Sequence, residues 1–317
     1  MLNKMARIEI SVMPPLAASS SIGATSSQNI MRFAQMADES GFNAILLQDH
    51  IGIPETETYD CFITLGAIAA LTKKTRVGTL ATPLPLRHPA LVAKAMATVD
   101  QISGGRAFLT VGAGWIRDDF RWYGLKYERF KTRVRMMREG TKVIKELWSK
   151  SPADFNGEFY RLEKACLEPK TIQKPYPPIW VAGVSEEALR VAVEEGNGWF
   201  GWKGITPEEF AKRVETVDRL CKERGRPRSE IGNGMHLQVS IALDEGSLKK
   251  QAGIWMHNRE RKDHHDMISC GTPEYFVDLL EEYVEAGANH INVVFVPVNK
   301  APDQLEIFAQ KVSSHFR

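Results

Sequence analysis

The sequence has few residues that could form disulfides or metal sites. Its 317 residues include four cysteines, and no two of them form a Cys-x-x-Cys pair. Disulfide-rich and zinc-binding chains need paired or closely spaced cysteines, so we expect free thiols with structural roles. One polar cluster, Asp263-His264-His265-Asp266, resembles a metal site in composition. Adjacent histidines on a helix point about 100° apart, so we expect a solvated surface there and no bound metal.

The sequence also lacks long apolar runs and a large excess of one charge. No stretch approaches the roughly 18 apolar residues that a membrane helix needs. Charged residues interrupt every apolar run before Ile8, so a signal-peptide core is not expected. The formal net charge is +2, which implies no strong field toward nucleic acid or membranes. We therefore expect a cytoplasmic protein without a nucleic-acid or membrane partner.

Strand-like and helix-like segments alternate along almost the whole chain. Such alternation is typical of parallel strands joined by right-handed crossovers. Eight units in about 300 residues predict a closed (β/α)8 TIM barrel, which we take as a single domain over residues 1–317. The expected strands are 7–12, 44–48, 76–81, 107–111, 179–182, 198–201, 236–242 and 291–296. The expected helices are 28–40, 59–71, 90–102, 130–148, 186–195, 207–224, 273–286 and 303–316.

Three stretches do not fit a minimal barrel. Residues 18–27 are small and polar, which suggests a loop at the barrel mouth. Residues 149–178 form a long proline-containing insertion, and residues 243–271 form a charged one. The sequence thus predicts insertions after the fourth and seventh strands.

Two polar residues follow the second expected strand directly. Asp49 and His50 come after the apolar run at 45–47, so a barrel places them at the carboxyl end of the strand, where barrel enzymes bind ligands. Histidine can donate a hydrogen bond or move a proton near neutral pH. These residues are candidate catalytic groups. The alternative is a loop turn followed by a histidine that is satisfied within the fold.

Two small-residue loops are candidate ligand sites. Gly112-Ala113-Gly114-Trp115 ends the fourth strand, and glycine lets a backbone approach a flat ring or a phosphate. It matches no dinucleotide or P-loop fingerprint. Ala182-Gly183-Val184-Ser185 leads into a helix that Ser185 can cap, and free N–H groups at a helix start bind anions. The alternatives are an ordinary glycine turn and a plain helix cap, with Trp115 either lining a substrate site or packing.

Several segments, taken in order, resemble the luciferase-like monooxygenase superfamily. Within it, they are most similar to the deazaflavin (coenzyme F-420)-dependent oxidoreductases. The matching segments are Gln48-Asp49-His50, Arg87-His88-Pro89, Asp100 to Arg106 (DQISGGR), Gly112-Ala113-Gly114-Trp115, Asp119-Phe120 and Pro177 to Gly183 (PPIWVAG).

The resemblance implies roles for the residues of the second and third strands. His50 would lie near the reactive ring carbon as a proton donor or electrostatic stabiliser, and Asp49 would hold the loop or the His50 tautomer. Leu80-Ala81, before Thr82, would form a cis peptide whose bulge backs the cofactor ring. The alternative for Leu80-Ala81 is an ordinary strand end.

The resemblance also implies how the cofactor and the subunits are arranged. Gly112 to Trp115 would bind the cofactor, and Ala182 to Ser185 its phosphate. A homo-oligomer, most simply a dimer, is expected. Relatives that use the deazaflavin with a sugar phosphate carry Glu where this chain has Trp115, and Trp where it has Pro54. Both departures argue against that activity.

The resemblance therefore implies an oxidoreductase that transfers hydride between a deazaflavin and an organic substrate. The alternative enzyme is an FMN-dependent monooxygenase of the same superfamily, which uses reduced flavin and oxygen. A third interpretation, from another class, is a flavin-binding protein without turnover.

Overall fold

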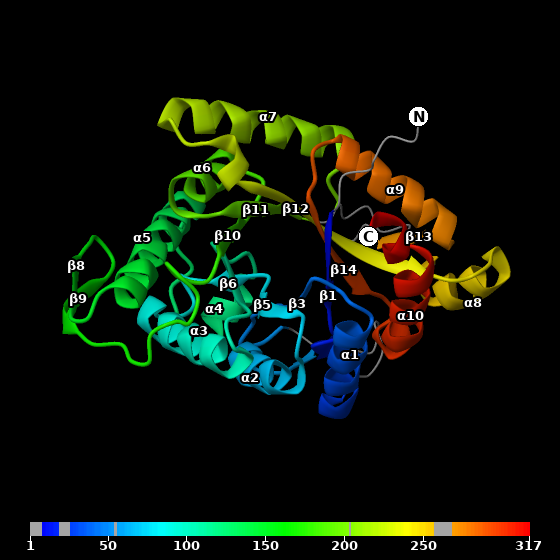
Figure 1. Cartoon of the computed structure of the whole chain (residues 1–317), viewed down its shortest axis with the longest axis horizontal. Helices are drawn as coiled ribbons and strands as arrows, with labels where there is room; N and C mark the ends of the chain where they lie inside the picture. The colour runs from blue at the N-terminus through cyan, green and yellow to red at the C-terminus, as the bar shows by residue number, and fades with distance from the viewer. Residues whose placement is uncertain (1–7, 19–25, 54–55, 203, 257–267) are drawn as a thin grey trace.

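Alternating strands and helices close into a (β/α)8 barrel in the computed structural model of the chain (Figure 1). The structure describes residues 8–18, 26–53, 56–202, 204–256 and 268–317. Eight parallel strands of this part form the ring, because β7 pairs with β10 and β14 pairs with β1. In ring order they are β1 (Glu9–Met13), β3 (Ala44–Leu47), β5 (Arg76–Thr79), β7 (Ala107–Gly112), β10 (Ile179–Ala182), β11 (Gly198–Gly201), β12 (Gly232–Ile241) and β14 (His290–Phe295).

The barrel confirms the predicted fold class and the predicted order of strands. Strand β3 shows why the apolar runs form strands here, since all of its residues are buried. Parallel strands covered on both faces read as continuous apolar sequences. The registers are regular, with Ala44 opposite Arg76 and Val77 opposite Ala107.

Helices cover the outside of the ring (Figure 1). They are α1 (Ser27–Glu39), α2 (Cys61–Leu71), α3 (Pro89–Ser103), α5 (Phe130–Ser149), α6 (Glu186–Glu195), α7 (Pro207–Arg224), α9 (Pro273–Glu285) and α10 (Ala301–Lys311). Helix α2 begins two residues later than predicted, because the Asp60 side chain caps it by accepting from Ile63 N at 2.9 Å. Helix α10 is shorter than predicted, and a separate 3-10 turn, Ser313–Phe316, follows it. None of the described helices is long and apolar enough to cross a membrane.

Several short elements lie in segments that the sequence left irregular. The insertion at 149–178 contains a hairpin, and the one at 243–271 contains a helix and a strand that pairs with β12. Apart from the 12-residue α8, they have two to five residues each, which is too short to show a period. These elements are β2 (Ala17–Ala18), β4 (Glu57–Thr58), β6 (Thr82–Pro83), α4 (Asp118–Arg121), β8 (Ala153–Asn156), β9 (Arg161–Ala165), η1 (Arg228–Glu230), α8 (Glu245–Met256), β13 (Ile268–Gly271) and η2 (Val298–Lys300).

The inside of the barrel is divided into an apolar side and a polar side. The apolar side is a cluster of buried residues, Met13, Ala44, Leu46, Leu80, Phe108, Trp180 and Phe200. The polar side contains four buried side chains on β1, β12 and β14, namely Ser11, His236, His290 and Asn292. Barrel interiors are usually filled by bulky apolar residues, so the polar side departs from the usual pattern.

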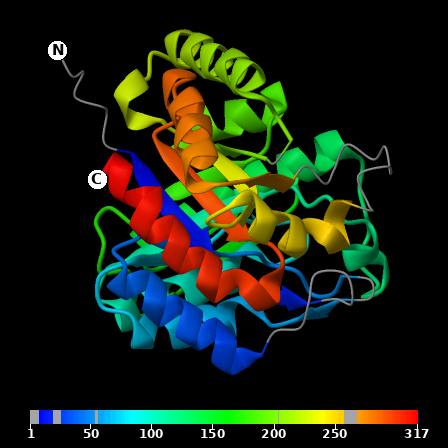
Figure 2. The same ribbon diagram turned by 90° about the vertical axis from the view of Figure 1, so that its right-hand side faces the viewer.

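The two ends of the described chain close the ring together. Strand β1 pairs with β14 from Glu9 opposite His290 to Met13 opposite Val294. Helices α1 and α10 lie side by side on the outside of this seam (Figure 2). The Arg317 side chain donates a hydrogen bond to the Ser40 carbonyl, which ties the C-terminal residue to the end of α1.

Candidate active site

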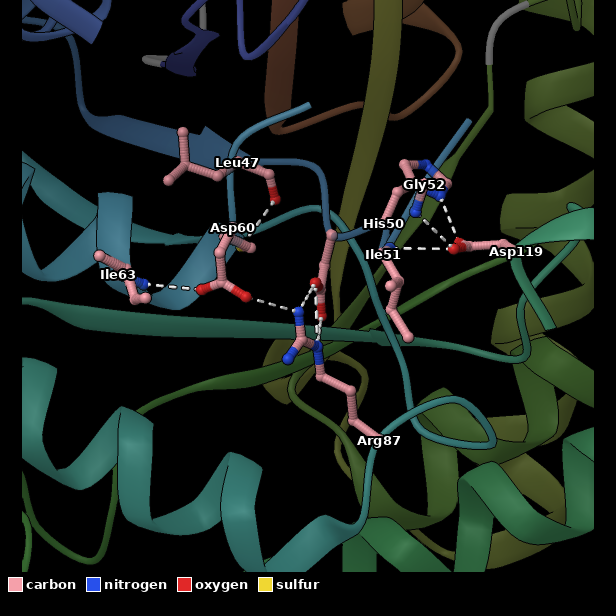
Figure 3. A network of polar contacts seen from close by, with 10 residues as sticks. Leu47, His50, Ile51, Gly52, Asp60, Ile63, Arg87 and Asp119 are labelled. Carbon is pink, nitrogen blue, oxygen red and sulfur yellow. Dashed lines mark hydrogen bonds and ion pairs between the residues drawn. The ribbon is translucent and has the colours of Figure 1, made fainter. Parts of the chain in front are cut away.

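The candidate site lies at the carboxyl ends of the barrel strands, which we call the mouth. Strand β3 ends at Leu47, and the chain then passes through Asp49 and His50. His50 keeps 13% of its side-chain surface exposed, whereas the facing Asp119 of α4 keeps 2%. His50 Nδ1 lies 2.9 Å from Asp119 Oδ2 (Figure 3). A histidine partly open to solvent is therefore held by a buried carboxylate.

Asp119 fixes both the loop and the tautomer of His50. Its other oxygen, Oδ1, accepts hydrogen bonds from Ile51 N at 2.9 Å and Gly52 N at 3.0 Å. Burial raises the pKa of Asp119, but the hydrogen bonds from His50 and the two amides outweigh it, so the pKa lies below 3.8. An ionised carboxylate only accepts, so Nδ1 carries the proton and Nε2 of the neutral ring is an acceptor.

Asp49 contacts Arg87 and does not contact the His50 ring, so it does not set the His50 tautomer. Its carboxylate is fully buried and accepts from Arg87 Nε at 2.9 Å and Arg87 Nη2 at 2.8 Å. Arg87 also reaches Asp60, the cap of α2, at 3.1 Å (Figure 3). Burial raises the pKa of Asp49 and the guanidinium opposes that effect. Of the two roles considered for Asp49, the contacts favour holding the loop, since Asp119 holds the tautomer.

The Leu80–Ala81 peptide bond is cis, as the family resemblance implied. Leu80 N donates to the Leu47 carbonyl at 2.7 Å, which joins the ends of β5 and β3. Leu80 and the partly buried Ala81 pack with the apolar cluster of the barrel, and Thr82 is fully buried. A Cβ built on Gly112 would lie 3.4 Å from Ala81 Cβ, so the end of β7 faces Ala81 with no side chain between them.

The loop after β7 turns sharply and exposes a tryptophan. Gly114 has φ +74°, and a Cβ there would lie 2.8 Å from the Phe120 ring, so this position requires glycine. Trp115 is 61% exposed and meets the His50 ring edge-on, with centroids 6.5 Å apart. Most of its ring surface is open to solvent, and its role beside a substrate stays a prediction. Ala113 is partly buried against the core.

The loop after β10 forms the expected helix start. Ser185 caps α6 by accepting from Ala188 N at 3.2 Å. Gly183 has φ +152°, and a Cβ there would lie 2.8 Å from Ala188 Cβ. Two acids, Glu186 and Glu187, occupy the first helical turn, which opposes binding of a phosphate by the helix dipole. Arg190 and Arg219 pair with Glu186 at 3.1 and 3.0 Å and offset part of that charge. Ala182 and Val184 complete this loop, and its use for a phosphate stays a prediction.

The structure adds residues that sequence reasoning did not single out. Asp119 was noted only as part of a motif, and Arg87 likewise. Trp202 lies 6.3 Å from Trp115 between ring centroids, and it stacks on His236 at 4.9 Å. One signal could have indicated His236: alternate residues of β12, from Gly234 through His236 to Gln238, are small or polar where a barrel strand would carry apolar ones.

Metal chemistry finds no support in the described part of the chain. Within those residues, no three His, Cys, Asp or Glu side chains gather as metal ligands. None of the four cysteines, Cys61, Cys166, Cys221 and Cys270, forms a disulfide. The Asp263 to Asp266 cluster and Pro54 lie outside the described residues.

Comparisons with known proteins agree with the barrel and the site motifs. Residues 8–290 match the model of the luciferase-like monooxygenase family. An FMNH(2)-dependent dimethylsulfone monooxygenase of Pseudomonas putida is 31% identical over 196 residues, which is 61% of this chain but only 53% of that relative. An F-420-dependent glucose-6-phosphate dehydrogenase of Microbacterium testaceum is 23% identical over 91% of this chain and 93% of its own.

A solved structure shares the fold over its whole length. An F-420-dependent secondary alcohol dehydrogenase, in complex with an F-420–acetone adduct, superimposes with a TM-score of 0.83 at 22% identity. The match covers 98% of this chain and 99% of that one.

Proposed function

The chain belongs to the luciferase-like monooxygenase family, and from that premise we propose that it is an oxidoreductase transferring hydride between coenzyme F-420 and an organic substrate. The observation that carries the proposal is the His50–Asp119 pair beside Trp115 at the mouth. Hydride transfer to or from a carbon–oxygen or similar bond also moves a proton, and His50, held by Asp119, can accept or donate that proton. The near-full-length similarity to an F-420-dependent relative supports the choice of cofactor.

The described residues fit a flat ring at the mouth. The Leu80–Ala81 bulge and the bare face of Gly112 form one wall, and Trp115 stands on the exposed side near His50. When bound, a deazaflavin would supply or accept hydride at its ring carbon. The chain would bind and orient the ring, and His50 Nε2 would take or give the accompanying proton. Asp119 would keep the His50 imidazole in the tautomer with the proton on Nδ1, and it would stabilise the protonated imidazole.

Two rival functions remain distinct from this proposal. The similarity to a monooxygenase supports FMN with oxygen as the alternative chemistry, and a flavin-binding protein without turnover is the third. A sugar-phosphate dehydrogenase is disfavoured, because an exposed tryptophan, Trp115, stands where those relatives carry a carboxylate.

The assembly belongs to the proposal as well. We propose a cytoplasmic homodimer that acts on a small molecule and uses neither nucleic acid nor a membrane as a partner. Helix α2 is apolar on all sides, and its Ile63 is 78% exposed. Leu91, on the neighbouring α3, is 70% exposed. Large apolar side chains on adjacent helices are suited to packing against a second copy.

A binding comparison tests the cofactor. We expect oxidised F-420 to bind at least about ten times more tightly than FMN, a difference of about 1.4 kcal/mol in binding free energy. Titrations that follow intrinsic tryptophan fluorescence would measure both affinities. His50→Ala serves as the matched control, because the proposal gives His50 a role in proton transfer and expects nearly unchanged cofactor affinity. FMN binding as tight as F-420 or tighter would favour the monooxygenase.

A further inference from the structure

A buried arginine near the start of α5 holds both ends of the loop that follows β7. The Arg133 side chain is buried. Its Nε donates to the Ala113 carbonyl at 3.1 Å, and its Nη1 donates to the Glu128 carbonyl. Ala113 directly follows β7 and Glu128 lies two residues before α5, so these bonds close residues 113–128 into a loop whose two ends meet at one guanidinium. Compact loops that are closed at the base frequently carry functional residues.

Tyr127 connects this arginine to the middle of the loop. The Arg133 guanidinium carbon lies 3.9 Å from the centre of the Tyr127 ring, which is a cation–π contact. The Tyr127 hydroxyl donates to the Trp115 carbonyl at 3.1 Å. The Tyr127 ring also meets the buried Phe120 ring at 71°, with centroids 5.2 Å apart. A continuous set of contacts therefore runs from Arg133 through Tyr127 to Phe120, the residue next to Asp119.

The surroundings of Arg133 match the shape of the guanidinium more than its charge. Within the described part of the chain, its contacts are two carbonyl oxygens and the rings of Tyr127 and Phe130, and none is with a carboxylate. The Glu128 carboxylate pairs with Lys126 at 2.6 Å. Burying a cation without a counter-ion costs stability, and hydrogen bonds offset that cost only in part. A planar guanidinium holds several donors in fixed directions, which an ammonium group cannot do.

We infer that Arg133 and Tyr127 are positioning residues, which fix loop 113–128 so that Asp119 stays against His50 and the start of the loop stays ready for the cofactor. The second part rests on the proposed function. The first part does not, because Asp119 Oδ2 lies 2.9 Å from His50 Nδ1 without any ligand. If the loop relaxed, Asp119 would no longer hold the proton of His50 on Nδ1. Coupling through packed side chains requires a direct measurement at His50.

The tautomer of His50 reports on the loop without any cofactor. Nitrogen NMR of the full chain labelled in histidine, recorded in mildly alkaline solution, should show His50 as the Nδ1–H form, with its signals identified by their loss in His50→Gln. Arg133→Met keeps an apolar stem in place and should give a mixture of both tautomers. Arg135→Met is the matched control, because Arg135 lies on the same helix but contacts Glu158 and Phe159 of the β8–β9 turn. It should leave the His50 signals unchanged.

Two further variants separate the guanidinium from its charge and guard against misfolding. Arg133→Lys keeps the cation, but one ammonium cannot bind both carbonyls and stack on the Tyr127 ring, so it should behave nearly as Arg133→Met does. Tyr127→Phe removes only the hydroxyl and should give a smaller change, which stays measurable if Arg133→Met does not fold. The inference is overturned by an Nε2–H ring in the unmodified protein, by unchanged His50 signals in Arg133→Met, or by full recovery in Arg133→Lys. Unchanged signals in Tyr127→Phe would exclude the Tyr127 hydroxyl.

Binding tests the second part of the inference. Oxidised F-420, or FMN if that binds better, should bind Arg133→Met about tenfold more weakly than the unmodified protein, because a loosened loop must be ordered again on binding. Arg135→Met should bind as the unmodified protein does. Equal affinity in Arg133→Met would overturn the role of the loop in cofactor binding. If neither cofactor bound the unmodified protein, the proposed function would fail, and the tautomer of His50 would still decide whether Arg133 positions Asp119.

Discussion

At the scale of single residues, the site depends on a carboxylate 69 positions away in the chain. Asp119 holds His50 and two neighbouring amides with its two oxygens, while Asp49, beside the histidine in sequence, is turned toward Arg87. The sequence next to His50 therefore identified the end of the strand, but it did not identify Asp119 as the partner of His50. The residue that sets the chemistry of His50 comes from a different βα unit.

Removing the His50 ring is expected to slow the chemical step. His50→Ala should lower the hydride-transfer rate by about a hundredfold or more, since general acid–base groups contribute typically 10²–10⁴-fold. Cofactor affinity should stay nearly unchanged. Single-turnover kinetics beside a cofactor titration would measure both.

The conservative variant separates the two roles open to His50. A hydrogen-bonding or electrostatic role predicts that His50→Gln keeps more activity than His50→Ala, whereas proton transfer predicts that both fail alike. Full turnover in His50→Ala with a lowered melting temperature would instead make the residue structural.

At the scale of elements, short segments carry the residues that complete the site. Helix α4, Asp118–Arg121, has four residues and brings Asp119 to the mouth. The turn at Gly114 places α4, because the Phe120 ring occupies the space of a missing Cβ. The loop between β7 and α5 is therefore as important to the site as the strands.

Gly114→Ala is expected to destabilise the protein by more than the positive φ of Gly114 alone would cause. Gly124 has a similar φ, +71° against +74°, but nothing lies within 4 Å of a Cβ there. Gly124→Ala should cost about 1–2 kcal/mol for the left-handed conformation. Gly114→Ala should cost more, and it should also reduce activity through Asp119. Denaturant unfolding of both variants, with turnover, makes the comparison, and equal costs would contradict it.

The junction of α1 with β5 predicts a pH dependence. Asp38 accepts from the backbone N–H groups of Lys73, Lys74 and Thr75 at 2.8–3.0 Å. Burial raises its pKa, but these bonds prevail and lower it from 3.8 to about 2. Because the folded-state pKa is the lower one, the stabilisation is complete above about pH 4 and is lost as the pH falls toward 2.

Asp38→Asn should therefore destabilise the protein by about 1–3 kcal/mol at pH 7, and by progressively less below pH 4. Urea unfolding at pH 7, 4 and 3 would measure the difference. Asp303→Asn, at an exposed position in α10, should show no such trend. A difference that stayed constant down to pH 3 would refute the role of the Asp38 carboxylate.

At the scale of the whole molecule, the barrel was predictable and much of its interior was not. Short apolar runs mark the strands and amphipathic periodicity marks the helices, so the eight strands and their helices follow from sequence. The cis bond was expected only through the resemblance. Side-chain partners such as His236 and Asn292 lie 56 positions apart, and no local pattern encodes which distant residue a polar group meets.

Some motifs behind the resemblance proved structural. Asp100 of the DQISGGR segment accepts from the backbone N–H groups of Ile172 and Gln173 at 2.6 and 3.0 Å. It thereby anchors the insertion before β10 and lies away from the mouth residues. Such a motif identifies a fold family without indicating its chemistry.

The exposed apolar residues of α2 and α3 make the assembly testable. If two copies pack through these helices, the double variant Ile63→Glu and Leu91→Glu should be a monomer in sedimentation experiments. The reason is that burying an unpaired charge in the interface is strongly unfavourable. Ile172→Glu places the same charge at a 45% exposed site outside both helices and should leave the assembly intact. A dimer that survived the double change would place the interface elsewhere.

The seam between β1 and β14 has a consequence for the order of events in folding. The Ser11–Asn292 bond joins positions 281 apart, and contacts at such separation form only after much chain entropy has been lost. Helices and individual βαβ units can form earlier, but the polar side of the interior exists only once the ring has closed. On refolding from urea, helical signal should therefore return before the capacity to hold a cofactor. That capacity would report on completion of the barrel as a whole.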